Sequence, residues 1–460
     1  MRPKTKIKLL FLVSVMLITV GFRCSCIKSA EEREATKSVG LTYWTVWNSP
    51  TDLSGLISKY QAVHPNIRIN VQKLRYEEYE DKILEAYAQL NPPDIISLHY
   101  GWMRDYALRK KFISPMPESI TMAYQYTEKK FGVKEEVTTE LKTSATPSPA
   151  KIKEDYLDTV YNDIVLNNKI YGLPLSIDTM VMYYNRDLLN KANIPLPPTN
   201  WQDFQSAIKK ITTFSDQEKT INTAGSALGT ADNIRRSVDI LMLLMMQNGA
   251  KIIENNNVLL SRPSIDRTYN PGLEALKFYT DFSNPRKEVY TWNAEMPDAL
   301  EAFSNGKIAF YFGYSFDLPL IRAYSKNSIN LGISKMPQIQ DSQESYIANY
   351  WVETVSSRTE NPNEAWDFIL FMNRPENVSE YLTTAIRPTA LRSLVEAQIQ
   401  NDTLNIFASQ LLNSKTWYTG YNVNAAEEYV KEMINRVLDG ENPAQSLNLA
   451  ASRIQQTLLP

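Results

Sequence analysis

Cysteine and histidine are scarce in this 460-residue chain, and their scarcity excludes several kinds of site. The cysteines are Cys24 and Cys26, and the histidines are His64 and His99. Beyond residue 26 the sequence therefore allows no disulfide, no thiol nucleophile and no cysteine-ligated metal. Neither histidine belongs to an H-E-x-x-H arrangement, so we expect neither a metal nor a cofactor.

The short motifs of the common enzyme classes are also absent. The sequence has no G-x-S-x-G, no P-loop and no strand-linked G-x-G-x-x-G. A glycosidase would need two carboxylates about 5 to 10 Å apart. Asp178, Asp317 and Glu353 could converge in a cleft, but nothing in their spacing indicates that they do. We therefore expect a binding protein rather than an enzyme.

Basic charge is too thinly spread beyond the N-terminus for a nucleic-acid binder. Of the 49 basic and 51 acidic residues, five basic and no acidic residues lie in the first 26 positions, so the rest carries a net charge of about −7. No basic cluster interleaved with aromatic residues occurs. Hydrophobic residues make up 43% and charged residues 22%, which is typical of soluble globular material, and the length allows two or three domain-sized units.

The N-terminus has the layout of an export signal. Four basic residues precede an apolar run over 9–20 that is too short to span a bilayer comfortably. We interpret 1–26 as a signal peptide, with an uncleaved membrane anchor as the alternative.

Cys24 and Cys26 follow the apolar run directly, in a setting that resembles a bacterial lipoprotein signal. Arg23 departs from the small and apolar residues that such signals carry, so either Cys24 or Cys26 is the candidate for lipid attachment. The polar residues 27–38 then form a tether. We expect an exported protein of the cell surface or periplasm, anchored through an N-terminal lipid.

Strand and helix patterns alternate over the 60 residues that follow the tether. Period-2 and helical spacings predict strands at 39–44, 67–71 and 94–98 and helices at 52–63 and 77–90. This β-α-β-α-β alternation predicts a parallel sheet covered by helices. Ligands bind outside the carboxyl ends of the strands in such sheets.

Two aromatic clusters occupy such strand ends. The first, in YWTVWNSP, comprises Tyr43, Trp44 and Trp47, and the second comprises His99, Tyr100 and Trp102. A flat ring beside polar side chains suits stacking on a sugar face. We predict that Tyr43 alternates toward the core and that Trp44 meets the ligand, while Trp47 is either a second stacking face or a lid.

Five stretches of the sequence, taken in order, resemble the extracellular solute-binding proteins of ABC importers, a family that includes maltose and oligosaccharide receptors. They are HPNIRINV (64–71), PDIISL (93–98), YGLPLSIDTMVMYYNRDLL (171–189), FSNGKIAFYFGYS (303–315) and INRVLDGENPAQSLNLAASRIQQTL (434–458). The resemblance spans about residues 40 to 460. Tyr314 and Ser315 depart from it, because many members carry Trp there.

The resemblance implies an α/β fold of two lobes, the type II periplasmic-binding-protein arrangement, in which each lobe is a sheet flanked by helices and the ligand cleft lies between the lobes. The implied boundaries are 39–178 for lobe one with an insertion at 124–155, 179–310 for lobe two, 311–355 for a return to lobe one, and 356–460 for C-terminal helices of lobe two. We expect the insertion to be a surface segment with a flexible Pro/Ser/Thr loop. The implied mechanism is hinge closure around a ligand, with the closed form recognised by a membrane permease.

Further candidates for the cleft come from the crossing segments and from rings in loops. The predicted ligand-binding residues are Trp44, Trp47, Tyr100, Trp102, Asp178, Tyr183, Trp292, Tyr314, Trp351, Arg387 and Trp417. A turn cap is the alternative for Asp178, and an ion pair with an acid is the alternative for Arg387. Trp201 and Trp366 are expected to be core residues.

The leading hypothesis is a carbohydrate-binding receptor of an ABC importer, acting as a monomer that delivers a mono- or oligosaccharide to its permease. One alternative is the same scaffold binding a peptide, a polyamine or another small polar solute. Another is a secreted carbohydrate-active enzyme or an adhesion protein. Clustered rings with few net charges in the cleft would favour sugar, whereas a ring of like charges would favour a charged solute.

Overall fold

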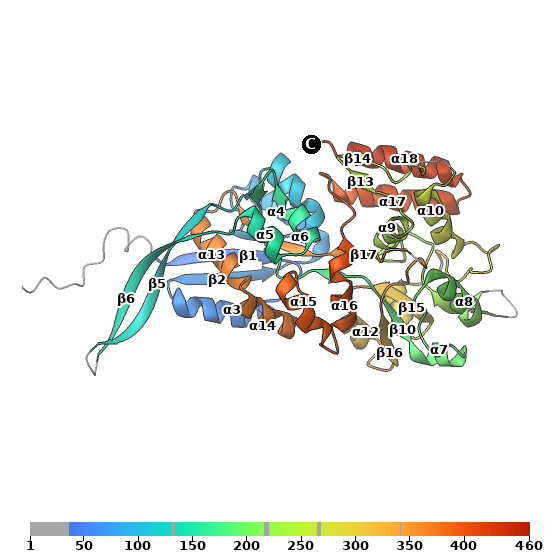
Figure 1. Cartoon of the computed structure of the whole chain (residues 1–460), viewed down its shortest axis with the longest axis horizontal. Coiled ribbons are helices and arrows are strands. Elements are labelled where there is room, and N and C mark those ends of the chain that lie inside the picture. Colours follow the sequence, from blue (N-terminus) through green and yellow to red (C-terminus); the bar gives the residue numbers. More distant parts are fainter. Residues whose placement is uncertain (1–35, 131–133, 216–219, 265–267, 341) are drawn as a thin grey trace, which may run out of the picture.

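The computed structural model describes residues 36–130, 134–215, 220–264, 268–340 and 342–460, and it contains two five-stranded sheets that are each covered by helices (Figure 1). The predicted signal peptide, both candidate lipid-attachment cysteines and most of the tether lie outside these residues. None of the helices within the described ranges combines the length and the apolar character needed to cross a bilayer.

The first sheet has the strand order β2-β1-β3-β18-β4. Its strands are β1 (Val39–Thr45), β2 (Ile67–Lys73), β3 (Ile95–His99), β4 (Ile113–Ser114) and β18 (Trp351–Ser356). β1 pairs in parallel with β2 and β3, while β18 runs antiparallel to β3. The helices α3 (Pro50–Val63) and α4 (Tyr76–Ala88) make the two crossovers, which confirms the predicted β-α-β-α-β unit.

Capping hydrogen bonds fix the start of α3, directly after the aromatic stretch. The Ser49 side chain accepts a hydrogen bond from the Asp52 amide, and the Asp52 side chain accepts one from the Ser49 amide. This capping box satisfies two backbone donors of the first turn, and Pro50 occupies a position where no backbone N–H is needed. The chain therefore turns sharply after Trp47 and leaves that ring at the end of the sheet.

Further elements pack on the first sheet and complete the first lobe. They are the hairpin of β5 (Ser119–Lys130) and β6 (Lys134–Ala145), the helices α5 (Pro149–Asp155), α6 (Asp158–Ile164), α13 (Pro362–Met372), α14 (Pro375–Ala385) and α15 (Arg392–Ile399), the short strands β7 (Val165–Leu166) and β8 (Lys169–Ile170), and the single turns η1 (Tyr100–Trp102) and η2 (Asp105–Arg109). The hairpin projects well beyond the rest of the lobe, at the left of Figure 1.

The insertion differs from the flexible loop that was predicted. The stretch that suggested a loop is paired strand as far as Ala145, and a helix begins at Pro149. Ser148 caps that helix by accepting a hydrogen bond from the Lys151 amide. A proline in the first turn and a serine at the cap position start a helix as readily as they mark a loop, which explains the error.

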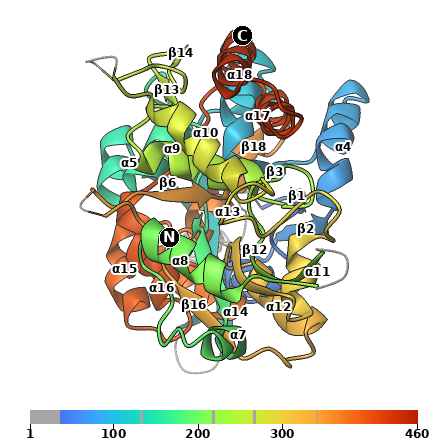
Figure 2. The same ribbon diagram turned by 90° about the vertical axis from the view of Figure 1, so that its right-hand side faces the viewer.

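The second sheet has the order β11-β12-β15-β10-β16. Its strands are β10 (Val181–Asn185), β11 (Thr213–Phe214), β12 (Ile221–Ser226), β15 (Ile308–Gly313) and β16 (Leu331–Ser334). The other elements of this second lobe are α7 (Arg186–Lys191), α8 (Trp201–Ile211), α9 (Ser237–Gln247), β13 (Ile253–Glu254), β14 (Asn257–Val258), α10 (Pro271–Asp281), α11 (Ala299–Ser304), α12 (Asp317–Tyr324), α17 (Val423–Leu438) and α18 (Pro443–Gln456). Figure 2 shows α17 and α18 side by side at one edge of the molecule.

The predicted lobe boundaries need correction at two places. β15 and β16 pair with β10 in the second sheet, so the chain returns to the first lobe only at β18 and not near Tyr311. The helix α13 packs on β18, α3 and β5, α14 packs on α3, and α15 packs on α14 and α5, which places all three in the first lobe and not among C-terminal helices of the second. An apolar strand or helix fits either core equally well, so sequence alone did not assign it.

A small three-stranded sheet lies where the chain passes between the lobes. It consists of β9 (Asp178–Thr179), β17 (Tyr346–Asn349) and β19 (Ser414–Lys415), with α16 (Asn405–Gln410) and η3 (Leu411–Asn413) beside it. Gln410 Nε2 donates hydrogen bonds to Thr179 Oγ1 and Met180 O, at 3.1 and 2.9 Å. Three segments far apart in sequence are thus held together at the junction.

Candidate functional site

The aromatic residues at the end of β1 alternate between buried and partly buried positions, as the sequence pattern predicts. The Tyr43 ring is fully buried, and its hydroxyl oxygen accepts a hydrogen bond from Asn48 Nδ2 at 3.2 Å. Trp44, the next residue, is only partly buried. The core position of Tyr43 is therefore confirmed, while the contact of Trp44 with a ligand stays a prediction.

Trp47 joins the two lobes. Its ring meets Phe316 edge to face with the centroids 4.7 Å apart, and Phe316 follows β15 of the second lobe. The Arg387 guanidinium carbon lies 4.1 Å from the Trp47 ring centroid, and Arg387 Nη2 donates to the Trp47 carbonyl at 3.0 Å. Within the described ranges Arg387 makes no ion pair with an acid, so its partner is an indole and not the carboxylate that we had considered.

A cluster of rings lies where β3 ends and β18 begins. The Trp351 ring meets Trp102 edge to face at 5.6 Å between centroids and meets His99 at 5.7 Å. Tyr76, at the start of α4, approaches Trp351 at 6.2 Å and is 50% exposed. Tyr100 stacks on Tyr350 at 5.6 Å. The structure thus brings Trp351 together with Tyr100 and Trp102, which lie in a distant segment of the sequence.

The second lobe contributes a group of aromatic and charged side chains around Tyr314. The rings of Tyr314 and Phe316 stack at 5.7 Å, and the Arg236 guanidinium lies 5.6 Å and 5.2 Å from their centroids. The Tyr314 hydroxyl donates to Asp239 Oδ2 at 2.9 Å, and the Tyr183 hydroxyl donates to the Tyr314 carbonyl at 2.6 Å. Sequence reasoning missed Arg236, Asp239 and Phe316, because nothing local distinguishes them from ordinary helix and loop residues.

The charges between the lobes largely offset one another. Burial, reinforced by the nearby Asp239 and opposed by Arg236, raises the pKa of Glu427 on α17 to about 7. Burial lowers the pKa of His99 to about 3, and Arg236 reinforces the effect, so His99 is neutral near pH 7. One arginine therefore faces two acids, one of which is partly protonated at neutral pH.

Asp178 lies at the junction of the lobes and has the role of a turn cap. Its Oδ2 accepts hydrogen bonds from the Ser315 amide at 2.8 Å and the Ser315 hydroxyl at 2.6 Å, and its Oδ1 accepts from the Thr179 amide. Burial raises the pKa of Asp178 to about 7, and the hydrogen bonds from Ser315 lower it in part. These contacts tie the first crossing segment to the segment that follows β15.

Glu353 on β18 is a buried acid beside the aromatic stretch. Its Oε1 accepts hydrogen bonds from Asn48 Nδ2 at 3.0 Å and from Ser97 Oγ at 3.3 Å. Burial raises the pKa of Glu353 to about 7, against the lowering effect of Tyr43, Ser97 and Asn48 as hydrogen-bonding partners. Its other oxygen, Oε2, has no hydrogen-bond partner among the described residues.

Three buried polar atoms of the candidate residues are without partners in the described part of the chain: Glu353 Oε2, Arg387 Nη1 and Trp417 Nε1. A buried polar atom that makes no hydrogen bond costs about 1–3 kcal/mol. Two of these atoms are donors and one is an acceptor when ionised, a combination that suits hydroxyl groups, which both donate and accept.

Trp292 is buried away from these ring contacts. It is fully buried in the second lobe, and its Nε1 donates to Asn233 Oδ1 at 3.2 Å. No ring contact within the described ranges joins it to the clusters around Trp351 or Tyr314. The polar sequence neighbour Asn293 suggested that Trp292 would be exposed, but the indole N–H of Trp292 donates to a residue inside the lobe.

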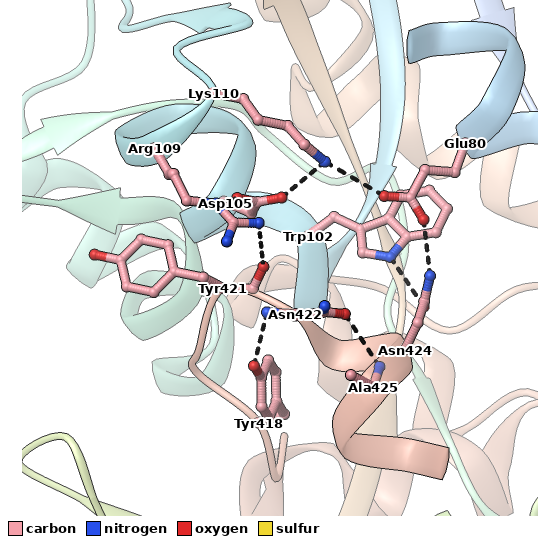
Figure 3. A network of polar contacts seen from close by, with 10 residues as sticks. All are labelled: Glu80, Trp102, Asp105, Arg109, Lys110, Tyr418, Tyr421, Asn422, Asn424 and Ala425. Carbon is pink, nitrogen blue, oxygen red and sulfur yellow. Dashed lines mark hydrogen bonds and ion pairs between the residues drawn. The ribbon is translucent and has the colours of Figure 1, made fainter. Parts of the chain in front are cut away.

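The rim of the junction carries a polar network that crosses from lobe to lobe (Figure 3). Asn424 on α17 accepts a hydrogen bond from Trp102 Nε1 at 3.4 Å and donates one from Nδ2 to Glu80 Oε2 at 2.7 Å. Lys110 forms ion pairs with Glu80 and Asp105, at 3.5 and 2.8 Å. Both ends of one second-lobe amide thus bond to the first lobe.

One of the acids considered for a glycosidase is held in a turn of the second lobe. Asp317, the third acid considered for a glycosidase, accepts hydrogen bonds from Tyr311 Oη at 3.2 Å and from the Tyr314 amide at 3.1 Å, so it holds its own turn. Across the ranges that the structure describes, no three His, Cys, Asp or Glu side chains are grouped to hold a metal ion.

The comparisons with known proteins agree on one protein family. The profile described as "Bacterial extracellular solute-binding protein" matches residues 55–407. The arabinooligosaccharide-binding protein of Bacillus subtilis is 22% identical over 286 residues, which are 62% of this chain and 56% of that protein. The chain spans about half the length of the curated relatives it matches.

Solved structures of low identity share the fold. The GacH receptor of Streptomyces glaucescens, solved unliganded and in complex with acarbose, aligns with a TM-score of 0.69 at 18% identity, covering 92% of this chain and 98% of the receptor. UgpB of Mycobacterium tuberculosis in complex with glycerophosphocholine aligns with a TM-score of 0.69 at 15% identity, covering 91% and 98%. These alignments confirm the predicted two-lobed α/β fold.

Proposed function

Because this chain belongs to the bacterial extracellular solute-binding proteins, we propose that it is the solute-binding component of an ABC importer and that it captures a carbohydrate between its two lobes. The observation that carries the proposal is the facing of aromatic rings from both lobes across a junction whose charges nearly cancel. Rings supply flat apolar faces for a sugar, and a zone of low net charge does not select a charged solute.

The polar groups of the junction complement those rings. Glu353 Oε2, Arg387 Nη1 and Trp417 Nε1 would bond sugar hydroxyls, which are able to donate and to accept. The relatives whose names state a ligand include oligosaccharide-binding proteins, which supports the assignment. A glycerol-3-phosphate-binding protein is also among them, so a phosphorylated polyol is the competing ligand class.

The mechanism we propose is closure of the two lobes around the ligand. Trp44 and Trp351 would contact the sugar from the first lobe. From the second lobe the partly buried Phe316 and Arg236, which pack on the fully buried Tyr314, would do so. A ligand that contacts both walls stabilises the closed arrangement by the difference between its affinities for the two states. A membrane permease would then recognise the closed form of a monomer that is exported and held at the membrane by Cys24 or Cys26.

A ligand screen tests this function. We expect mono- or oligosaccharides to raise the melting temperature, because a ligand that binds only the folded chain stabilises it by mass action. The panel should include amino acids, short peptides, polyamines and glycerol 3-phosphate. If one of these raises the melting temperature and no sugar does, the carbohydrate assignment is wrong.

Replacing Asn424 with alanine is expected to weaken the binding of the best sugar from that screen by about tenfold. The substitution removes two hydrogen bonds between the lobes, and each contributes about 0.5–1.5 kcal/mol. Loss of closed-state stability lowers the apparent affinity by the same free energy. Calorimetric titration measures the change.

Asn435→Ala is the matched control on the same helix. Asn435 Nδ2 donates to Asp232 Oδ2 at 3.1 Å, a contact within the second lobe. This variant should bind the sugar as the unchanged protein does. Equal affinities for the two variants would show that the Asn424 contacts do not contribute to closure.

A further inference from the structure

A cavity lies outside the ring clusters of the junction, at the base of the β5–β6 hairpin on the first lobe. It has a volume of about 500 Å³ and is walled by the hairpin, by α5 and by the segment that joins α13 to α14. Cavities of about 300–1,000 Å³ accommodate small organic ligands. The hairpin and α5 belong to the insertion at 124–155 and its flanks, so the cavity depends on the part of the chain that departs from the family pattern.

The floor of this cavity is apolar. Ile120 and Met122 of β5, Ile152 of α5 and Tyr156 are all buried, and Leu370 of α13 lies beside them. Contact with such a surface favours a ligand with a hydrocarbon or aromatic body by about 25 cal/mol for each Å² of apolar area removed from water.

The two acids at the cavity are already engaged. Lys151 Nζ forms an ion pair with Asp155 at 2.9 Å. Asp367 Oδ2 accepts a hydrogen bond from Tyr60 at 2.9 Å and lies 3.4 Å from His64 Nε2. Asp155 is therefore neutralised by Lys151, whereas Asp367 lies beside a histidine whose pKa is lowered by burial, and Arg374 also acts on Asp367 by lowering its pKa.

Two further cations, Lys142 and Arg374, line the cavity, so its walls carry three cations against two acids. Lys142 of β6 lies 6.0 Å from the Tyr124 ring centroid, and Arg374 lies 5.2 Å from that of Phe371. Neither cation makes an ion pair within the described part of the chain. Cations on the wall of an apolar cavity attract an anionic group, and a guanidinium can bind a carboxylate or sulfonate with two hydrogen bonds.

We propose that this cavity binds a small amphipathic anion, with the apolar body on the floor and a single carboxylate or sulfonate between Lys142 and Arg374. The site shares no residue with the junction of the lobes and does not depend on the carbohydrate assignment.

Equilibrium dialysis of the full chain tests the proposal with two probes of the same body. Naphthalene-2-sulfonate should bind at one site and about tenfold more tightly than the neutral naphthalene-2-sulfonamide. The double variant Lys142→Gln/Arg374→Gln should abolish that preference, since both side chains lie at the surface and their loss leaves the core intact. Equal affinities of the two probes for the unchanged protein would overturn the proposal.

Three further measurements test whether the sulfonate probe binds in this cavity. Met122→Trp, which fills the floor, should abolish binding while circular dichroism reports an intact fold. Lys153→Gln is the matched control, because Lys153 is on α5 but over Tyr161, outside the cavity. It should bind the sulfonate normally, as should protein saturated with its sugar. Sulfonate binding that survives Met122→Trp in a folded protein, or that is lost when sugar is added, would overturn the assignment.

Discussion

Replacing Trp44 with alanine is expected to weaken sugar binding by about thirtyfold or more and to leave the protein folded. Trp44 is the penultimate residue of β1 and is only partly buried, so its ring adds less to the core than its neighbour Tyr43 does. Truncating a central aromatic contact of a binding site costs at least about 2 kcal/mol, which corresponds to the thirtyfold loss. Calorimetric titration with the best sugar measures it.

Trp366 supplies the control for ring loss. It is 1% exposed on α13, and its removal is expected to lower the free energy of unfolding by about 3–5 kcal/mol through the cavity that it leaves. The affinity of the Trp366→Ala variant for sugar, measured under conditions in which the variant is folded, should equal that of the unchanged protein. A Trp44 variant that unfolds like the Trp366 variant, and that binds sugar normally while folded, would assign Trp44 to the core.

The second large effect concerns Glu353→Gln and the pH dependence of stability. The folded protein holds a proton on Glu353 that the unfolded chain releases, because burial raises the pKa of Glu353 from 4.5 to about 7. Stability therefore falls as pH rises through this window, where the folded state binds more protons than the unfolded state. The rise in the pKa of Glu353 lowers the free energy of unfolding by about 3 kcal/mol at pH 8.

Glutamine removes this loss because it does not ionise. Its amide oxygen can accept from Asn48 and Ser97 as Oε1 does, and its amide nitrogen takes the position of the unpartnered Oε2. We expect the variant to match the unchanged protein in urea denaturation at pH 5 and to exceed it at pH 8. The unchanged protein should lose stability over this range, because burial also raises the pKa of Asp163 and Asp178 to about 7.

Glu428→Gln, at an exposed position on α17, controls for the charge change and should follow the profile of the unchanged protein. If Glu353→Gln follows that profile as well, Glu353 is ionised in the folded state at neutral pH, and our account of its burial is wrong.

Patterns within a few residues predicted much of the fold. The spacing of apolar residues located β1, α3, β2, α4 and β3 to within about two residues, because the periods of strands and helices are local properties. The alternation along β1 also separated the buried Tyr43 from the partly buried Trp44. Trp201 and Trp366 are buried as predicted.

Contacts between distant segments were beyond the reach of such patterns. Asn424 bonds Glu80 across 344 positions, and Trp47 meets Phe316 across the junction, yet each side chain is unremarkable in its own stretch. Trp292 shows a different limit: polar sequence neighbours suggested a cleft position, but the ring is buried inside the second lobe and its N–H donates to Asn233. The placement of β15 shows the same limit, since its partners and not its composition assign it to the second sheet.

The most direct test of the account is a crystal structure of the protein with the sugar that gives the largest thermal shift. We predict electron density for the sugar between the lobes, with a ring face on Trp44 or Trp351 and with contacts to Phe316 or Arg236 on the opposite wall. Sugar density elsewhere on the molecule, including the cavity beneath the hairpin, would contradict the central claim that the two lobes close on a carbohydrate.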